Sequence, residues 1–461
     1  MKIIEFGIIA LLILTPLPAA STDDWAVLAI ELGAAFLAAV YVLSRRRPVL
    51  NAKLAAKLVW PGRLLIGLFV FISVQFIPIP KPILSFFSPN AVELRQAYSP
   101  HFAEIKTMTL SLVPIRTFRA ALELLAYVLI GFLVVRTFVH RRQIQRLMTV
   151  LAACGAVQAL YALFELYRSN PHVLFYKKVY NLGSATGTFI NRNHFSGYLE
   201  LIIPIALTLL LARIDMFSLA GKRWPEKMSQ MTGKGFSGNV ILIIAIVIMS
   251  LGVLKSQSRS GAFILVLTFV LFFELTVFHF SKARYGQTWI KTVLKSVFLL
   301  VTIGALYVGV EGTLSRFASD RLLQDGRPQY WNNVLTMFAR FPVFGTGYGT
   351  FADVYPAFQT VTLEGRLVHA HNDFLENLAE LGIIGFALMM GAIGFLLLDG
   401  FRTWSKRRHP QIKALGMGGF VSAAAILVHG LTDFNLHIPA NAVLFSVILG
   451  LAYAAAYYRK A

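Results

Sequence analysis

The chain has 461 residues, of which 57% are hydrophobic and only 14% are charged, and its mean hydropathy is +0.66. This composition is too apolar for a soluble protein of that length, and it predicts a polytopic membrane protein. The net charge of +21 first suggests nucleic acid. However, the basic residues lie in short loops between apolar runs, and no basic-aromatic module accompanies them, so nucleic-acid binding is not expected.

Apolar runs of membrane-spanning length recur along the whole chain. They predict an all-α fold of about twelve transmembrane helices. The approximate centres of these helices are Ile9, Leu32, Phe69, Val128, Val157, Leu207, Ala245, Thr268, Thr302, Leu388, Ala425 and Leu449. The first run, with Lys2 before it and Ala19-Ala20-Ser21 after it, fits either a cleaved signal peptide or a retained helix, and the retained helix is favoured.

Basic residues occupy every second loop and thereby predict the topology. Arg45, Arg142, Arg223 and Arg408 each lie in a loop that is rich in Lys and Arg and poor in acids. By the positive-inside rule, these loops and both termini are cytoplasmic. The remaining loops face outward, and the largest of them spans residues 312–376.

The large outer loop carries several arginines before a short histidine-containing segment. Arg316, Arg321, Arg327, Arg340 and Arg366 precede His369-Ala370-His371-Asn372-Asp373. A loop of this length between membrane helices suggests function. Arginines followed by histidines at the mouth of a helix predict an anion site with a base beside it.

Three further outer loops contribute polar residues near helix ends. Arg192 and His194 follow the small residues of 183–188, Arg259 lies in the very short loop 255–261, and Asp433 follows His429. A helix N-terminus favours anions, and a charge near the membrane usually has a partner. The alternative for both arginines is a side chain that snorkels to the interface. Asp433 is expected to support the site by pairing with an arginine or capping a helix.

The histidines of the large loop admit three interpretations: a metal site, a general base, or a histidine that caps the start of the following helix. His369, His371 and Asp373 alternate along the chain and could hold a metal ion. Few acids and no cysteine lie nearby, and the single cysteine, Cys154, excludes a cysteine-cluster site. One histidine acting as a base is therefore favoured over a metal site, and no cofactor is expected.

Together these stretches resemble the O-antigen ligase family, which also includes O-antigen and exopolysaccharide polymerases and some protein O-oligosaccharyltransferases. The matching stretches are Thr186–Gly197, Ser258–Gly261, Gly326–Trp331, Pro342–Gly349, Ala370–Leu375 and His429–Asn441. The chain departs from the ligases at Phe263, where they have a leucine four residues after the arginine.

The resemblance implies a metal-independent glycosyltransferase of the GT-C type in the bacterial inner membrane. Such an enzyme moves a glycan from undecaprenyl diphosphate to a hydroxyl of a glycan or lipid A-core acceptor on the periplasmic side. The family's catalytic residues map onto His371, Arg259 and Arg327. Arg192, His194, His369, Asn372 and Asp433 are the candidate substrate-binding residues.

The resemblance also suggests a division of the chain. Residues 1–180 would form N-terminal membrane helices, residues 181–441 an O-antigen ligase-like core that includes the loop 312–376, and residues 442–461 the last helix and a cytoplasmic tail. A lipid-linked glycan flippase or transporter remains the alternative function, because Glu165, Glu200, Glu274 and Asp399 lie within apolar runs.

Overall fold

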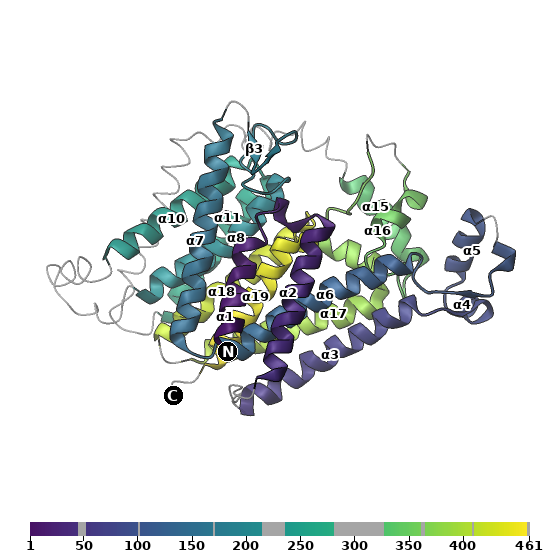
Figure 1. The fold of residues 1–461 in the computed structure, drawn as a ribbon, viewed down its shortest axis with the longest axis horizontal. Helices are drawn as coiled ribbons and strands as arrows, with labels where there is room; N and C mark the ends of the chain where they lie inside the picture. The colour runs from purple at the N-terminus through teal and green to yellow at the C-terminus, as the bar shows by residue number, and fades with distance from the viewer. Residues whose placement is uncertain are drawn as a thin grey trace.

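The computed structural model describes residues 1–44, 52–99, 102–168, 171–213, 236–280, 327–360, 365–407 and 410–458. Within these ranges the chain is helical apart from loops and two short hairpins, which confirms the predicted all-α class (Figure 1). The hairpins pair β1 (Ile79–Pro80) with β2 (Thr107–Met108), and β3 (His172–Val173) with β4 (Tyr176–Lys177).

The long helices form one bundle. They are α2 (Asp24–Leu43), α3 (Ala52–Phe76), α6 (Pro114–Thr137), α7 (Arg141–Leu166), α8 (Arg192–Arg213), α10 (Phe236–Lys255), α11 (Arg259–Phe280), α17 (Asp373–Ser405), α18 (Pro410–His429) and α19 (Pro439–Tyr457). The shorter elements are α1 (Lys2–Leu14), η1 (Ala19–Ser21), α4 (Lys81–Phe87), α5 (Pro89–Tyr98), η2 (Phe102–Glu104), α15 (Arg327–Arg340), α16 (Phe351–Val354), η4 (Tyr355–Phe358) and η5 (Asn435–His437). In Figure 1, β3, α15 and α16 lie at the upper end of the bundle, and the N-terminus lies near the lower end.

Nine helices of the described chain are long and apolar enough to cross a membrane. They contain the predicted centres Leu32, Phe69, Val128, Val157, Leu207, Ala245, Thr268, Leu388 and Leu449. The apolar stretch around Ala425, Lys413–His429, is shorter, and α1 around Ile9 has only 13 residues. The predicted span at Thr302 lies outside the described residues. The chain is thus a multi-pass membrane protein, and the expectation of about twelve spans is confirmed for nine.

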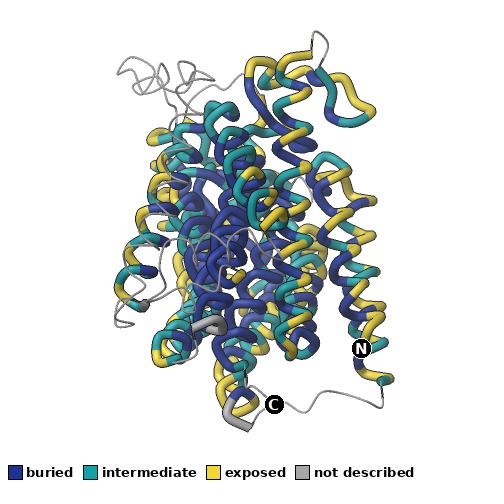
Figure 2. The backbone as a smooth tube through the Cα atoms, turned by 90° about the vertical axis from the view of Figure 1, so that its left-hand side faces the viewer, coloured by how far each residue is buried: buried dark blue, intermediate teal, exposed yellow. Residues whose placement is uncertain are grey.

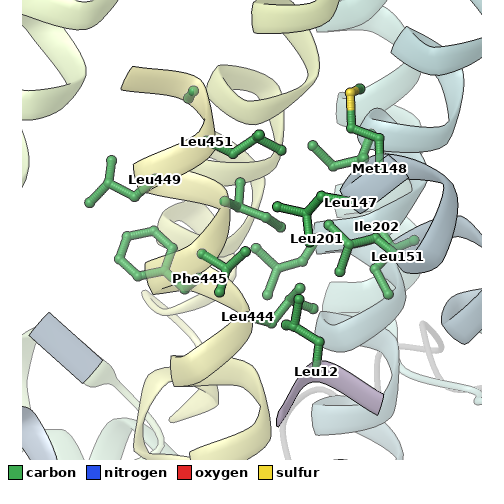
Figure 3. Packing of buried hydrophobic residues seen from close by; sticks show 14 of the residues in the cluster. Leu12, Leu147, Met148, Leu151, Leu201, Ile202, Leu444, Phe445, Leu449 and Leu451 are labelled. Atoms are coloured by element: carbon green, nitrogen blue, oxygen red, sulfur yellow. The ribbon is translucent and has the colours of Figure 1, made fainter. Parts of the chain in front are cut away.

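The centre of the bundle is formed by α8, α18 and α19. The whole apolar window of α8 is buried, against 22% of that of α3, which lies at the periphery. In Figure 2 buried backbone fills the middle of the molecule and exposed backbone lies mainly at its edges. Figure 3 shows how side chains such as Leu201 and Leu444 interdigitate there. A helix that is apolar on every face is expected in such a central position.

Small residues allow the central helices to approach one another closely. A Cβ built at Gly450 would lie 2.7 Å from Gly131 O, and one built at Gly418 would lie 2.5 Å from Pro204 O. These contacts bring α19 against α6 and α18 against α8. Small residues at helix contacts are typical of membrane bundles, where packing rather than the hydrophobic effect drives association.

The glycine-rich turn 345–349, which follows α15, is hydrogen-bonded to α17. α17 departs from helical geometry at Gly382 (φ 59°, ψ −175°), and this break leaves backbone groups free for other partners. Gly347 N–H donates to Glu380 O at 3.0 Å, and Ile383 N–H donates to Pro342 O at 2.8 Å. Gly345 has φ +70°, and a Cβ there would lie 2.1 Å from Glu380 O. These hydrogen bonds and this close approach fix the position of the segment that follows α15 against α17.

We expect Gly345→Ala to destabilise the protein, because the added Cβ meets a backbone carbonyl and the positive φ is strained for alanine. The loss should be roughly 1–3 kcal/mol or more. Thermal unfolding in detergent micelles measures it. Gly394→Ala is the matched control, since no heavy atom outside its own helix lies within 4 Å of the added Cβ. Equal melting temperatures for the two variants would contradict this role of Gly345.

Candidate functional site

A fully buried carboxylate, Asp433, lies at the centre of the site. His371 Nδ1 lies 3.3 Å from Asp433 Oδ1, and Arg327 Nη2 lies 3.6 Å from Oδ2. Asn193 Nδ2 donates a hydrogen bond to Oδ2, and His194 Nε2 lies at ion-pair distance, 3.6 Å, from Oδ1. Burial alone would raise the pKa of Asp433, but its contacts with His194 and His371 lower the pKa well below the usual value. Asp433 is therefore an anion that four side chains surround.

These side chains come from four separate parts of the sequence. Asn193 and His194 lie in the first turn of α8, Arg327 begins α15, His371 precedes α17, and Asp433 follows α18. Each of these side chains therefore lies at or next to the end of a helix. The structure thus brings together four residues expected in the site, His194, Arg327, His371 and Asp433, and adds Asn193 to them.

The backbone around His371 is unusual. His371 has φ +51°, in the left-handed region that residues other than glycine rarely occupy. Asp373 N–H, two residues on, donates to the carbonyls of Gly430 at 2.8 Å and Asp433 at 3.1 Å. Asn372 caps α17 by accepting from Phe374 N and Leu375 N, and its Nδ2 donates to Leu431 O. Asn372 was expected to bind substrate, and in the structure its amide group holds the start of α17 to the loop that carries Asp433.

Arg327 is fixed by the loop that carries Asp433. Its Nη1 donates to Thr432 O at 2.6 Å, and its side chain is 20% exposed. Of the other loop arginines, Arg340 lies 3.5 Å from Glu93 and Arg366 lies 2.6 Å from Asp353, both on the surface. The predicted positions Arg316 and Arg321 lie outside the described residues.

Arg259 begins α11 beside the same loop. Ser260 Oγ and Thr432 Oγ1 are hydrogen-bonded at 2.9 Å, and a Cβ at Gly261 would lie 2.6 Å from Ser196 Oγ of α8. Arg192, at the start of α8, donates to Ser184 Oγ at 3.3 Å. The structure therefore places the starts of α8 and α11 side by side. Both lie next to the loop after α18, to which Arg327 is hydrogen-bonded.

A second polar cluster, which the sequence did not predict, adjoins the first. His369 Nδ1 lies 2.7 Å from Glu376 Oε1, and His437 lies between Glu376 and Asp373. Burial alone would lower the pKa of His437, but these carboxylates outweigh burial and raise the pKa to about 10. Asp373 and Glu376 are three residues apart in the first turn of α17, which places them on one helical face. No local pattern points to His437.

Phe434 separates the two clusters. Its ring centroid lies 4.3 Å from that of His369 in a stacked arrangement, 4.4 Å from that of His194 and 4.8 Å from that of His371. The two loop histidines therefore have different partners, since His371 faces Asp433 and His369 faces Glu376. The sequence alternation of His369, His371 and Asp373 does not form one metal site.

One family model matches part of the chain. The O-antigen ligase family model matches residues 244–390, a range that includes Arg259, Arg327, His369, His371 and Glu376. His194, Asp433 and His437 lie outside the matched range and reach the site through the fold. No curated protein matches the chain. The family match supports the assignment of this multi-pass membrane protein to the O-antigen ligase family.

Proposed function

We propose that the chain transfers a glycan from undecaprenyl diphosphate to an acceptor hydroxyl, in the polymerisation or ligation of a surface polysaccharide. The coarser function, O-antigen ligase-like, has the support of the family match. The observation that carries the finer proposal is the convergence of His371 and Arg327 on buried, ionised Asp433. We also propose a GT-C-like fold, an inner-membrane location, cytoplasmic termini, a periplasmic site, and a glycan or lipid A-core as the acceptor.

His371 is the proposed base. Its Nδ1 faces Asp433 Oδ1 at 3.3 Å, so the tautomer with a proton on Nδ1 leaves Nε2 as the acceptor of a proton. The histidine side chain is 26% exposed, which gives an acceptor hydroxyl access to the ring. Asp433 stabilises the imidazolium that forms, as the orienting carboxylate of a catalytic triad does.

The reaction is a single displacement. The acceptor oxygen bonds to the anomeric carbon as its proton passes to His371 Nε2. The bond from that carbon to the diphosphate oxygen breaks, and the electron pair leaves with the diphosphate. Inversion at the anomeric carbon follows from one displacement. No step of this scheme is assigned to a metal ion.

Arginines at helix starts stabilise the leaving group. Arg259, Arg192 and Arg327 begin α11, α8 and α15. Each helix N-terminus adds a partial positive charge to that of the guanidinium group. Fixed charge-assisted hydrogen bonds to a diphosphate strengthen as its negative charge develops. Arg327, which also contacts Asp433, links the leaving-group side of the site to the base.

Three of the four carboxylates that suggested transport have partners within the protein. Glu200 Oε2 lies 2.8 Å from His429 Nδ1, Asp399 Oδ1 lies 3.1 Å from Lys57, and Glu165 lies 3.1 Å from Arg168. Paired groups of this kind fit a role in holding helices together. This observation favours the transferase over a flippase or transporter.

Reporter fusions test the proposed topology. Fusions after Arg142 and Arg402 should report the cytoplasm, and sandwich fusions after Gly183 and Gly365 should report the periplasm, because the basic loops stay inside. A cytoplasmic signal at Gly365 would separate His371 from a periplasmic donor and refute the proposed reaction.

Substitutions should separate base from leaving-group binding. His371→Ala should lower single-turnover transfer by roughly 10²–10⁴-fold, the usual range for a lost general base, with donor affinity nearly unchanged. Arg259→Lys should weaken both donor binding and turnover, because an ammonium cannot reproduce the planar fork. Arg340→Lys, on the exposed face of α15, is the matched control. Normal turnover in His371→Ala would exclude the histidine as base.

Asp433→Asn tests the support of the base. We expect turnover to fall by roughly 10²-fold or more, because the neutral amide orients the ring of His371 poorly and does not stabilise its cation. Donor affinity and turnover are compared in protein that elutes as a single folded species. Asp353→Asn is the matched control, since Asp353 pairs with the exposed side chains of Arg116 and Arg366 and its substitution should change turnover little. Unchanged turnover in Asp433→Asn would remove Asp433 from the proposed mechanism.

A further inference from the structure

The cluster beside the proposed base gathers three side chains that bind metals in other proteins. His369 precedes α17, Glu376 lies in its first turn, and His437 belongs to η5. One ligand atom from each residue lies within 4.8 Å of the other two. Two imidazoles and one carboxylate form a ligand set typical of zinc.

The distances suit a small divalent ion. Zinc lies about 2.0–2.2 Å from nitrogen and oxygen ligands, so tetrahedral ligand atoms are roughly 3.3–3.6 Å apart. His437 Nε2 and Glu376 Oε1 are 3.4 Å apart and would not need to move. His369 Nδ1 and Glu376 Oε1, at 2.7 Å, would separate by about 0.6 Å to reach that spacing. His369, whose side chain is only partly buried, can make this movement by a small rotation of its ring.

The outer contacts orient these ligands. His437 Nδ1 lies 2.7 Å from Asp373 Oδ1, so its Nε2 is the atom directed at Glu376. Glu376 Oε2 accepts a hydrogen bond from Ala370 N–H at 2.7 Å, which leaves Oε1 for an ion. A carboxylate on the far nitrogen of a ligating histidine is the usual support of a zinc site.

Charge and access also favour a cation. Asp373 and Glu376 are both buried and acidic, and they flank His437. A divalent ion brings more positive charge to these carboxylates than a proton on one histidine ring. The side chain of His369 is 24% exposed, which provides an entry path and room for water as a fourth ligand.

We propose that His369, Glu376 and His437 bind one divalent transition-metal ion, with zinc as the best fit, and that Asp373 orients His437. The ion would join the start of α17 to η5. Phe434, which stacks on His369 and contacts His371, would be held in place by it. The hydrogen bonds described above already connect these segments without an ion. Transfer should therefore continue in chelator, while thermal stability falls.

The test is a direct measurement of binding and needs neither donor nor acceptor. Protein freed of its affinity tag and treated with chelator is titrated with ZnCl₂ by calorimetry, and bound zinc is measured by elemental analysis. We expect about one equivalent and a higher melting temperature with zinc. Co²⁺ in place of zinc should give the visible absorption of a low-symmetry site. An absence of stoichiometric binding would overturn the proposal.

Variants identify the ligands. His369→Gln and His437→Gln keep a hydrogen-bonding group but should lose zinc binding and the thermal shift. Asp373→Asn should weaken zinc binding by roughly 10–100-fold. His371→Gln and His140→Gln are controls that should bind zinc as the unaltered protein does. Binding retained in both His369→Gln and His437→Gln, or lost in His371→Gln, would refute this ligand set. Because the readout is binding, it is independent of the proposed transferase activity.

Discussion

The site depends on the buried carboxylate of Asp433, which needs hydrogen bonds and opposite charges in place of water. Removing a carboxylate from water is costly unless charges and hydrogen bonds replace the lost solvent. Asp433 meets this requirement through contacts with side chains at the starts of three helices. These side chains are His371, Arg327, His194 and Asn193. The groups that keep Asp433 ionised are thus also groups that glycan transfer would need. Loss of that anion would leave Arg327 and the histidines without the charge that gathers them.

A second constraint fixes the position of α15 and of the glycine-rich turn that follows it. α17 cannot continue regularly through Gly382, and its broken turn accepts the glycine turn that follows α15. Glu380, just before the break, accepts hydrogen bonds from Gly349 N–H and Phe351 N–H. The helix that begins beside His371 is therefore tied, two turns later, to the segment that carries Arg327. His371 and Arg327 keep their spacing because the segments that carry them are both attached to α17.

The membrane bundle provides a rigid support for these contacts. The described side chains of α8 and α18 are nearly all buried, and the fully buried pair of Glu200 and His429 joins the two helices. The pair lies near the ends of these helices that carry His194 and Asp433. A polar pair in an apolar surrounding is satisfied only when both partners are correctly placed. It therefore favours one relative position of the two helices, and with it the geometry of the site.

The sequence by itself determined the features that depend on local composition. Apolar length identified nine described spans, and residue chemistry selected Arg327, His371 and Asp433. Only the tertiary structure decided which histidine faces which acid, because His371 and Asp433 are brought together by the packing of α17 against the loop after α18. Glu376 and His437 were missed for the same reason. Hydropathy and residue spacing depend only on neighbours along the chain. The partners of a buried charge, in contrast, are groups that are distant in sequence and become adjacent only in the folded protein.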